Sequence, residues 1–163
     1  MKYVNLYLVV LSLFLTSGLI KTEKTSTGYY PGERLPNIVI NGMEEKTLDL
    51  SEYKGKKVVL NFWAAYDAHS RANNVAFHNY IKEHAAEDVA FISISFDENH
   101  NVFERTMLLD KIDTHSQFYV ANGAESKIYK DFQLNKGFRN YIIDKDGIIK
   151  EMNITVEKLK ELT

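Results

Sequence analysis

Residues 58–71 read VVLNFWAAYDAHSR, and this stretch decides the fold. Its first six residues form an almost continuous apolar run, which is typical of a strand that is covered on both faces. After a short turn, apolar residues recur at three- and four-residue spacing, which predicts a helix from about Asp67 to Ala85. A strand that runs into a helix N-terminus exposes backbone N–H groups at the surface. We therefore expect the chemistry of the chain to lie at this junction.

The rest of the chain alternates strands and helices. Strands are predicted at residues 36–41, 89–96, 117–120, 141–144 and 148–152, the last two joined by the turn Lys145-Asp146-Gly147. Helices are predicted at residues 99–110 and 124–132 and after Thr155, with a short helical turn capped by Ser51. Strands joined through helices imply parallel crossovers. The predicted fold class is therefore α/β, a mixed central sheet with helices on both faces.

The helical spacing also predicts which side chains point inward. In the first long helix they are Ala72, Val75, Ala76, Tyr80, Ile81 and His84 or Ala85. In the helix over residues 99–110 they are Val102, Phe103, Thr106, Met107 and Leu108 or Leu109.

Composition excludes several function classes. The 163 residues suit one domain, and the net charge of −2 with scattered Lys and Arg gives no basic field for nucleic acid. The chain has no cysteine. Disulfides, thiolate nucleophiles, iron–sulfur clusters and Cys-ligated zinc are therefore excluded for this chain alone.

Residues 1–20 read MKYVNLYLVVLSLFLTSGLI, the pattern of a secretory signal peptide with a cleavage site after Gly18. The alternative is an uncleaved anchor, because about 20 apolar residues span a bilayer. Polar residues 21–30 are predicted to be a linker, and residues 31–163 the folded domain. We expect an exported protein of the periplasm or cell envelope, in contact with the membrane only through residues 1–20 if they stay uncleaved.

Three segments together resemble one family. Residues 54–71, KGKKVVLNFWAAYDAHSR, resemble the GKxVLVNFWATWCxPCR run of thioredoxin-like TlpA/ResA-type (AhpC/TSA-like) thiol–disulfide oxidoreductases. Residues 36–56 match the family's lead-in strand, and residues 137–151, GFRNYIIDKDGIIKE, resemble its V-P-T-x-F-L-I-D-x-x-G-x-I segment. The resemblance covers about residues 31–162 and implies a thioredoxin-like fold.

The chain departs from the family at the residues that carry its redox chemistry. Alignment on Trp63 and Ala64 places Asp67 and Ser70 at the positions of the family's two cysteines. Alignment on Asp144 places Phe138 at the position of its cis-proline. Neither Asp nor Ser can exchange with a disulfide. The resemblance therefore implies the fold without the redox reaction, and we expect no catalytic residue and no cofactor.

The polar residues at the junction have structural and functional interpretations. Asp67 is a predicted helix N-cap, or else a general base or an anion-mimicking surface. Ser70 is predicted to be a locally bonded hydroxyl, because no base and no G-x-S-x-G elbow accompany it. His69 could pair with Asp67 or bind a metal ion, but no further ligands complete a set, so no metal site is predicted.

Two further pairs are binding candidates. Arg71 and Arg139 are expected near one edge, since the family brings these loops together, and would suit an anionic ligand or a partner's carboxylate. Tyr66 and Phe138 either form an exposed apolar patch or pack on each other in place of the missing proline and disulfide.

The hypothesis for function is a redox-inactive envelope module that binds a protein or peptide through the former active-site face. Two alternatives stay open. One is an enzyme of other chemistry that uses Asp67, His69 and Ser70. The other is thiol–disulfide exchange with sulfurs supplied by a partner.

Overall fold

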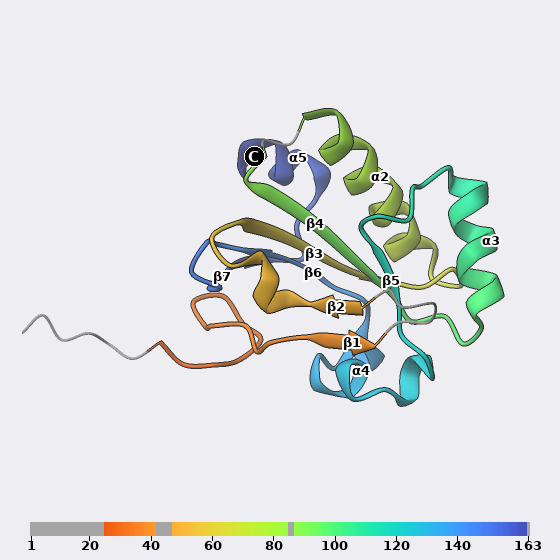
Figure 1. Ribbon diagram of the computed structural model, residues 1–163, viewed down its shortest axis with the longest axis horizontal. Helices are drawn as coiled ribbons and strands as arrows, with labels where there is room; N and C mark the ends of the chain where they lie inside the picture. The colour runs from red at the N-terminus through yellow and green to blue at the C-terminus, as the bar shows by residue number, and fades with distance from the viewer. Residues whose placement is uncertain (1–24, 42–46, 85–86, 163) are drawn as a thin grey trace, which may run out of the picture.

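The computed structural model describes residues 25–41, 47–84 and 87–162, and its centre is a five-stranded sheet (Figure 1). The strands are β3 (Lys57–Trp63), β4 (Val89–Ser95), β5 (Gln117–Tyr119), β6 (Asn140–Ile143) and β7 (Ile149–Met152), in the order β5-β4-β3-β6-β7. The predicted signal peptide or anchor lies outside the described residues. Among the helices that are described, none has the length and apolarity to cross a membrane.

The sheet is mixed, as predicted. β3 runs parallel to β4 with Val59 opposite Phe91, and β4 runs parallel to β5. Helices α2 (Ala68–His84) and α3 (His100–Asp110) make the two crossovers. β6 pairs antiparallel with β3, and β7 pairs antiparallel with β6. The parallel core and the antiparallel hairpin confirm the predicted fold class.

The side chains of β3 point alternately to the two faces of the sheet, and a separate hydrophobic layer packs on each face. Val58, Leu60 and Phe62 pack in a core beneath the small sheet of β1 (Val39–Asn41) and β2 (Thr47–Asp49). Val59 and Trp63 belong to clusters on the opposite face. The same first face holds the short helices η1 (Leu50–Tyr53), η2 (Gly123–Glu125), α4 (Lys127–Asp131) and η3 (Leu134–Lys136). The opposite face holds α2, α3 and α5 (Val156–Leu162), so helices cover both faces (Figure 1).

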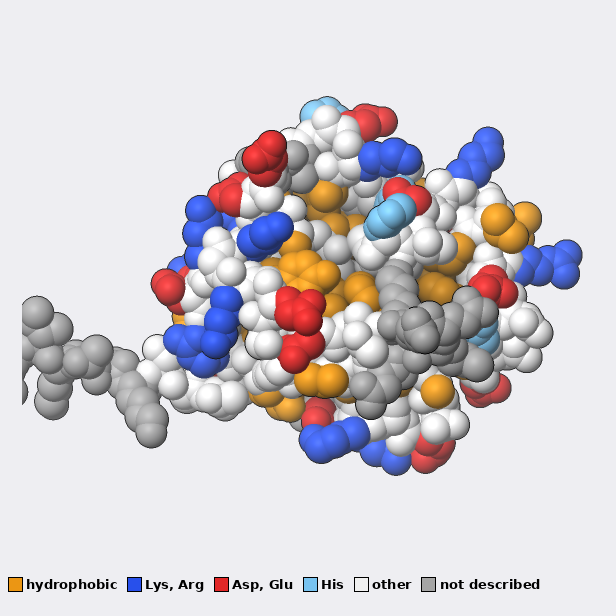
Figure 2. All heavy atoms as spheres, viewed as in Figure 1, with side chains coloured by type: hydrophobic (Ala, Val, Ile, Leu, Met, Phe, Trp, Pro, Cys, Tyr) orange, Lys and Arg blue, Asp and Glu red, His pale blue; other side chains and the backbone are white. Residues whose placement is uncertain are grey.

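The outer surface on the β1–β2 side mixes both signs of charge. Figure 2 shows Lys and Arg side chains interspersed with Asp and Glu side chains around the rim of this face, and hydrophobic side chains at its centre. The view shows no large area of a single sign.

The predicted inward face of α2 is correct in part, since Val75, Tyr80 and Ile81 are partly buried and pack against the clusters on that side of the sheet. The helix buries Ser70, Asn74, Phe77 and His78, whereas Ala72 and His84 are exposed. The reason is a polar row on the sheet beneath the helix. The Ser93 hydroxyl donates to Asn74 Oδ1 at 2.7 Å, and the amides of Asn74 and Gln117 bond to each other at 3.1 and 3.2 Å. Polar side chains therefore occupy buried positions of α2 that hydrophobic spacing alone does not predict.

The prediction for α3 is correct in part. Phe103, Thr106 and Met107 are buried, and they pack toward Trp63 and Tyr119. The prediction was wrong for three apolar residues that are exposed: Val102, Leu108 and Leu109. The helix lies over the edge of the sheet, so only one row of its side chains is covered.

The domain begins before the predicted boundary at residue 31. The Gly28 N–H donates to the Arg34 carbonyl at 3.0 Å, and the Arg34 N–H donates to the Ser26 carbonyl at 2.7 Å. The ring of Tyr29 packs edge-on against Phe132 with centroids 4.6 Å apart. Residues 26–30 are therefore part of the folded domain, because an aromatic anchor ties them to its core.

Two predicted caps have different outcomes. Asp49, and not Ser51, caps η1, since its Oδ1 accepts the Ser51 N–H at 2.9 Å. Thr155 does cap α5, because its Oγ1 accepts the Lys158 N–H at 3.3 Å. The predicted helix over residues 124–132 is divided at Ser126 into η2 and α4.

Candidate functional site

The junction between β3 and α2 is a capped corner. Asp67 Oδ1 accepts the Ser70 N–H at 2.8 Å, and the Asp67 carbonyl accepts the Arg71 N–H at 3.0 Å. An acidic side chain in this position satisfies a free N–H group and lies at the positive end of the helix dipole. The predicted N-cap role of Asp67 is confirmed.

Ser70 is also used within the corner. Its side chain is almost fully buried, donates to the Asp67 carbonyl at 3.2 Å and accepts the Ala64 N–H at 3.4 Å. His69 is exposed and its Nε2 lies 3.3 Å from the Asn73 amide. A nucleophilic serine needs a base within hydrogen-bond reach. The structure gives Asp67, His69 and Ser70 local partners and does not join them into a catalytic set.

Asp97 is a residue of this site that sequence reasoning missed. It lies two residues after the end of β4 and is only 1% exposed. Its Oδ1 accepts the Ala65 N–H at 2.8 Å, and its Oδ2 accepts the Ser95 hydroxyl at 2.8 Å. The available signal was an acidic residue at the end of a buried strand, next to the strand that leads into the corner. Asp97 fixes the backbone turn that presents Tyr66.

Tyr66 and Phe138 lie together on the surface above this turn. Their ring centroids are 6.1 Å apart, and the Tyr66 side chain is 65% exposed. Phe138 is half-buried and packs against Phe96 and Tyr129 with centroids at 6.2 and 6.3 Å. Partial burial, followed by the nearby Tyr129, raises the pKa of the Tyr66 hydroxyl. We call Tyr66, Phe138 and Tyr129 the aromatic patch. The two rings therefore contact each other while Tyr66 stays exposed.

The loop before β6 passes beside the corner. The described residues contain no cis peptide bond, so the Gly137–Phe138 bond is trans. Gly137 has a φ of 119°, a backbone conformation that residues with a side chain rarely adopt. The Arg139 carbonyl accepts the Phe62 N–H at 3.0 Å, which ties the loop to β3. Among the described residues, no partner bonds to the N–H or carbonyl of Phe138.

Arg71 does not join Arg139 at one anion site. Its Nε and a terminal nitrogen donate to the two carboxylate oxygens of Asp110 at 2.8 and 2.6 Å. These hydrogen bonds raise the pKa of the Arg71 guanidinium. Arg139 instead lines a hollow together with Lys136 and His69. The expected pairing fails because the Asp110 carboxylate on α3 accepts from Nε and one terminal nitrogen of Arg71 and holds the guanidinium there.

Replacement of Arg71 by Ala should lower the free energy of unfolding by about 1–3 kcal/mol, because it leaves the mostly buried Asp110 carboxylate without its partner. Urea titration followed by circular dichroism measures this loss. The Arg71→Ala/Asp110→Ala double variant should lose less than the sum of the two single variants. Strict additivity would show that the ion pair contributes nothing.

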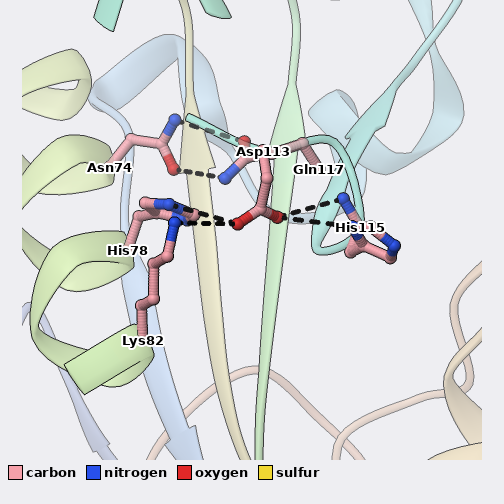
Figure 3. Close-up of polar contacts among 6 residues, drawn as sticks. All are labelled: Asn74, His78, Lys82, Asp113, His115 and Gln117. Carbon is pink, nitrogen blue, oxygen red and sulfur yellow. Dashed lines mark hydrogen bonds and ion pairs between the residues drawn. The ribbon is translucent and has the colours of Figure 1, made fainter. Parts of the chain in front are cut away.

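A second polar cluster surrounds Asp113, on the loop after α3 (Figure 3). His78 Nε2 lies 3.5 Å, Lys82 Nζ 3.9 Å and His115 Nδ1 3.7 Å from its carboxylate oxygens. Burial lowers the pKa of His78, an effect that Asp113 partly offsets. Within the described part of the chain, no group of three or more His, Asp or Glu side chains could hold a metal ion. The cluster holds the α3–β5 loop against α2.

The lowered pKa of His78 makes stability depend on pH. The unfolded chain takes up a proton on this residue near its ordinary value, about 6.5, while the folded chain resists it until lower pH. We expect the free energy of unfolding to fall as the pH drops below that value. The His78→Gln variant should lose part of this dependence, measured by urea titration at neutral and mildly acidic pH. Equal pH slopes in both proteins would contradict the assignment.

The sheet order and the capped corner that follows β3 define a thioredoxin-like fold. Residues 31–152 match the AhpC/TSA family, and the chain belongs to that family. It is 24% identical over 140 residues to the thioredoxin-like protein YneN of Bacillus subtilis, covering 86% of this chain and 81% of that protein. It is 27% identical over 130 residues to the thiol-disulfide oxidoreductase ResA of Bacillus cereus, covering 80% and 72%.

A solved structure gives the same assignment. The crystal structure of a thioredoxin-like protein from Parabacteroides distasonis is similar with a TM-score of 0.75 and 39% identity, covering 85% of this chain and 98% of that one. The resemblance expected from the sequence segments is therefore confirmed. The chain is a thioredoxin-like member of an oxidoreductase family. Unlike an enzyme that uses cysteine thiols, this chain contains no cysteine.

Proposed function

We propose that this chain is a redox-inactive thioredoxin-like protein of the cell envelope that binds a protein or peptide through the former redox face. The observation that carries the proposal is the aromatic patch, with Tyr66 65% exposed above Phe138. It lies where the family's sulfurs and proline would meet. The envelope location rests on the signal-peptide pattern of residues 1–20.

At the two positions where the family has cysteines, the side chains of Asp67 and Ser70 form hydrogen bonds with backbone groups. Thiol–disulfide exchange requires a thiolate that attacks a disulfide sulfur, and this chain has no thiol to supply. Asp67 and Ser70 bond to each other and to the first turn of α2. The corner is therefore stable in its present form and needs no disulfide.

The patch has the properties of a binding surface. Tyrosine offers a large contact area with few rotatable bonds, so it is enriched at energetically important interface positions. The Phe138 ring packs against Phe96 and Tyr129, so its position is fixed before a partner binds. The backbone groups of Phe138 add a donor and an acceptor that no described residue uses. An extended segment could use both.

The test is selection of peptides from a random display library on the immobilised protein, followed by measurement of their dissociation constants. Tyr66→Ala/Phe138→Ala should raise the dissociation constant by about tenfold or more, as expected for loss of a central aromatic anchor. The matched control is Val39→Ala, which removes an exposed apolar side chain elsewhere on the domain. Peptides that bind both variants equally, or no selected peptide at all, would contradict the proposal.

A further inference from the structure

A polar hollow of about 320 Å³ lies beside Phe138, and Tyr66 is not part of its lining. Its walls come from three segments that are distant in the sequence. The first turns of α2 contribute His69 and Asn73, the loop before β6 contributes Lys136 and Arg139, and the loop before α5 contributes residues 153–155. Phe138 belongs both to this wall and to the aromatic patch, so the two features are continuous.

The hollow carries positive charge without a counter-charge. Its described lining includes Lys136, Arg139 and the titratable His69, and it includes no Asp or Glu. Lys136 Nζ donates to the neutral Gln133 side chain at 2.7 Å. In the described part of the chain, neither Lys136 nor Arg139 forms an ion pair. The hollow is therefore lined by two cationic residues and by no described carboxylate, and the Arg139 guanidinium also lies close enough to the buried Tyr141 hydroxyl to act on its pKa.

The Tyr66 end of the aromatic patch lies near two acidic residues. Asp97 and Glu98 lie close enough to Tyr66 to act on its hydroxyl by charge. Asp97 is buried and bonded within the corner, whereas Glu98 is exposed. A partner segment therefore meets the Glu98 carboxylate near Tyr66 and the cations beside Phe138. Such complementary charge fixes the orientation and register of a partner more than its total affinity.

We propose that the hollow receives the carboxylate of an Asp or Glu side chain in a partner protein segment, while a neighbouring apolar side chain of that segment lies on the aromatic patch. This inference rests on the proposed function and specifies the partner's chemistry. Ammonium and guanidinium groups form charge-assisted hydrogen bonds with carboxylates. The amides of Asn73 and Asn153 and the Thr155 hydroxyl line the same space and can complete the contacts.

The test compares two blocked peptides, acetyl-Phe-Glu-Glu-amide and acetyl-Phe-Gln-Gln-amide, by amide chemical-shift titration of the labelled protein. The acidic peptide should bind about five- to tenfold more tightly, the size expected for two partly exposed ion pairs. High salt should remove this difference. Lys136→Gln/Arg139→Gln should also remove it.

Matched variants separate the hollow from general charge effects. Lys54→Gln/Lys56→Gln makes the same change in net charge in a separate hollow beside η1, and it should keep the preference for the acidic peptide. Tyr66→Ala/Phe138→Ala should weaken both peptides. Circular dichroism of each variant confirms that it is folded before it is compared.

Each contrary result has its own meaning. Equal binding of both peptides, with both weakened by Tyr66→Ala/Phe138→Ala, would overturn the inference and leave the proposed function standing. Failure of both peptides to bind would overturn the inference, while the library selection judges the proposed function separately. Sodium acetate or inorganic phosphate that binds as tightly as the acidic peptide would identify a site for small anions and would also overturn the inference.

Discussion

The Asp67→Cys/Ser70→Cys variant is expected to form an internal disulfide that dithiothreitol reduces, and to reduce insulin faster than background. The two positions already bond across the first turn of α2, with Asp67 Oδ1 2.8 Å from the Ser70 N–H. A Cys-X-X-Cys pair at a helix N-terminus has a lowered thiol pKa, and a fall from about 8.5 to about 7 gives roughly fifteenfold more thiolate at neutral pH. The mass of the oxidised protein and the insulin turbidity assay measure both effects.

The single variants are the controls for this prediction. Asp67→Cys alone and Ser70→Cys alone cannot close an internal disulfide and should stay at the background rate. The Asp67→Cys change also removes the N-cap, so it should cost about 1 kcal/mol of stability. A double variant that is folded but stays fully reduced under oxidising conditions would show that the corner no longer has the geometry of the redox family.

Replacement of Phe62 by Ala is expected to lower the free energy of unfolding by about 3–5 kcal/mol, the usual cost of removing a buried aromatic ring. Phe62 is only 1% exposed, and its ring contacts those of Phe96, Phe132 and Tyr141 with centroids 4.6–6.0 Å apart. The ring thus joins β3 and β6 to the segment after α4. Since domains of this kind are stable by about 5–15 kcal/mol, the variant should be close to unfolding at physiological temperature.

The control for Phe62 is Val39, which is 55% exposed on β1. Val39→Ala should change the free energy of unfolding by no more than about 0.5 kcal/mol. Chemical denaturation of both variants, with the denaturant slope compared to that of the wild type, gives the two values. A loss below about 1 kcal/mol for Phe62→Ala would mean that the core between the central sheet and the β1–β2 sheet relaxes into the cavity.

Local signals predicted much of the fold. The apolar run over residues 58–63 and the turn Lys145-Asp146-Gly147 gave the central strand and the terminal hairpin, since burial on both faces and turn chemistry are properties of short segments. The cap at Asp67 was also predicted, because its partner lies three residues away. Features of this kind depend on neighbours in the sequence.

Features that depend on distant residues were missed. The ion pair of Arg71 with Asp110 joins residues 39 positions apart, and the bond of Asp97 to Ala65 joins residues 32 positions apart. The polar face of α2 follows from Ser93 and Gln117, which reach Asn74 only after the sheet forms. Hydrophobic spacing within one helix contains no information about such partners. The capped corner was therefore predicted from the sequence, while its contacts with distant residues needed the structure.

The proposed binding surface is tested most directly by an amide chemical-shift map of the labelled protein with the tightest peptide from the library selection. The largest shifts should fall on Tyr66, Asp67, Gly137 and Phe138, where the aromatic patch meets the capped corner. Largest shifts at the opposite end of the sheet, in the separate hollow lined by Tyr53 and Lys145, would contradict the claim that the former redox face is the binding surface.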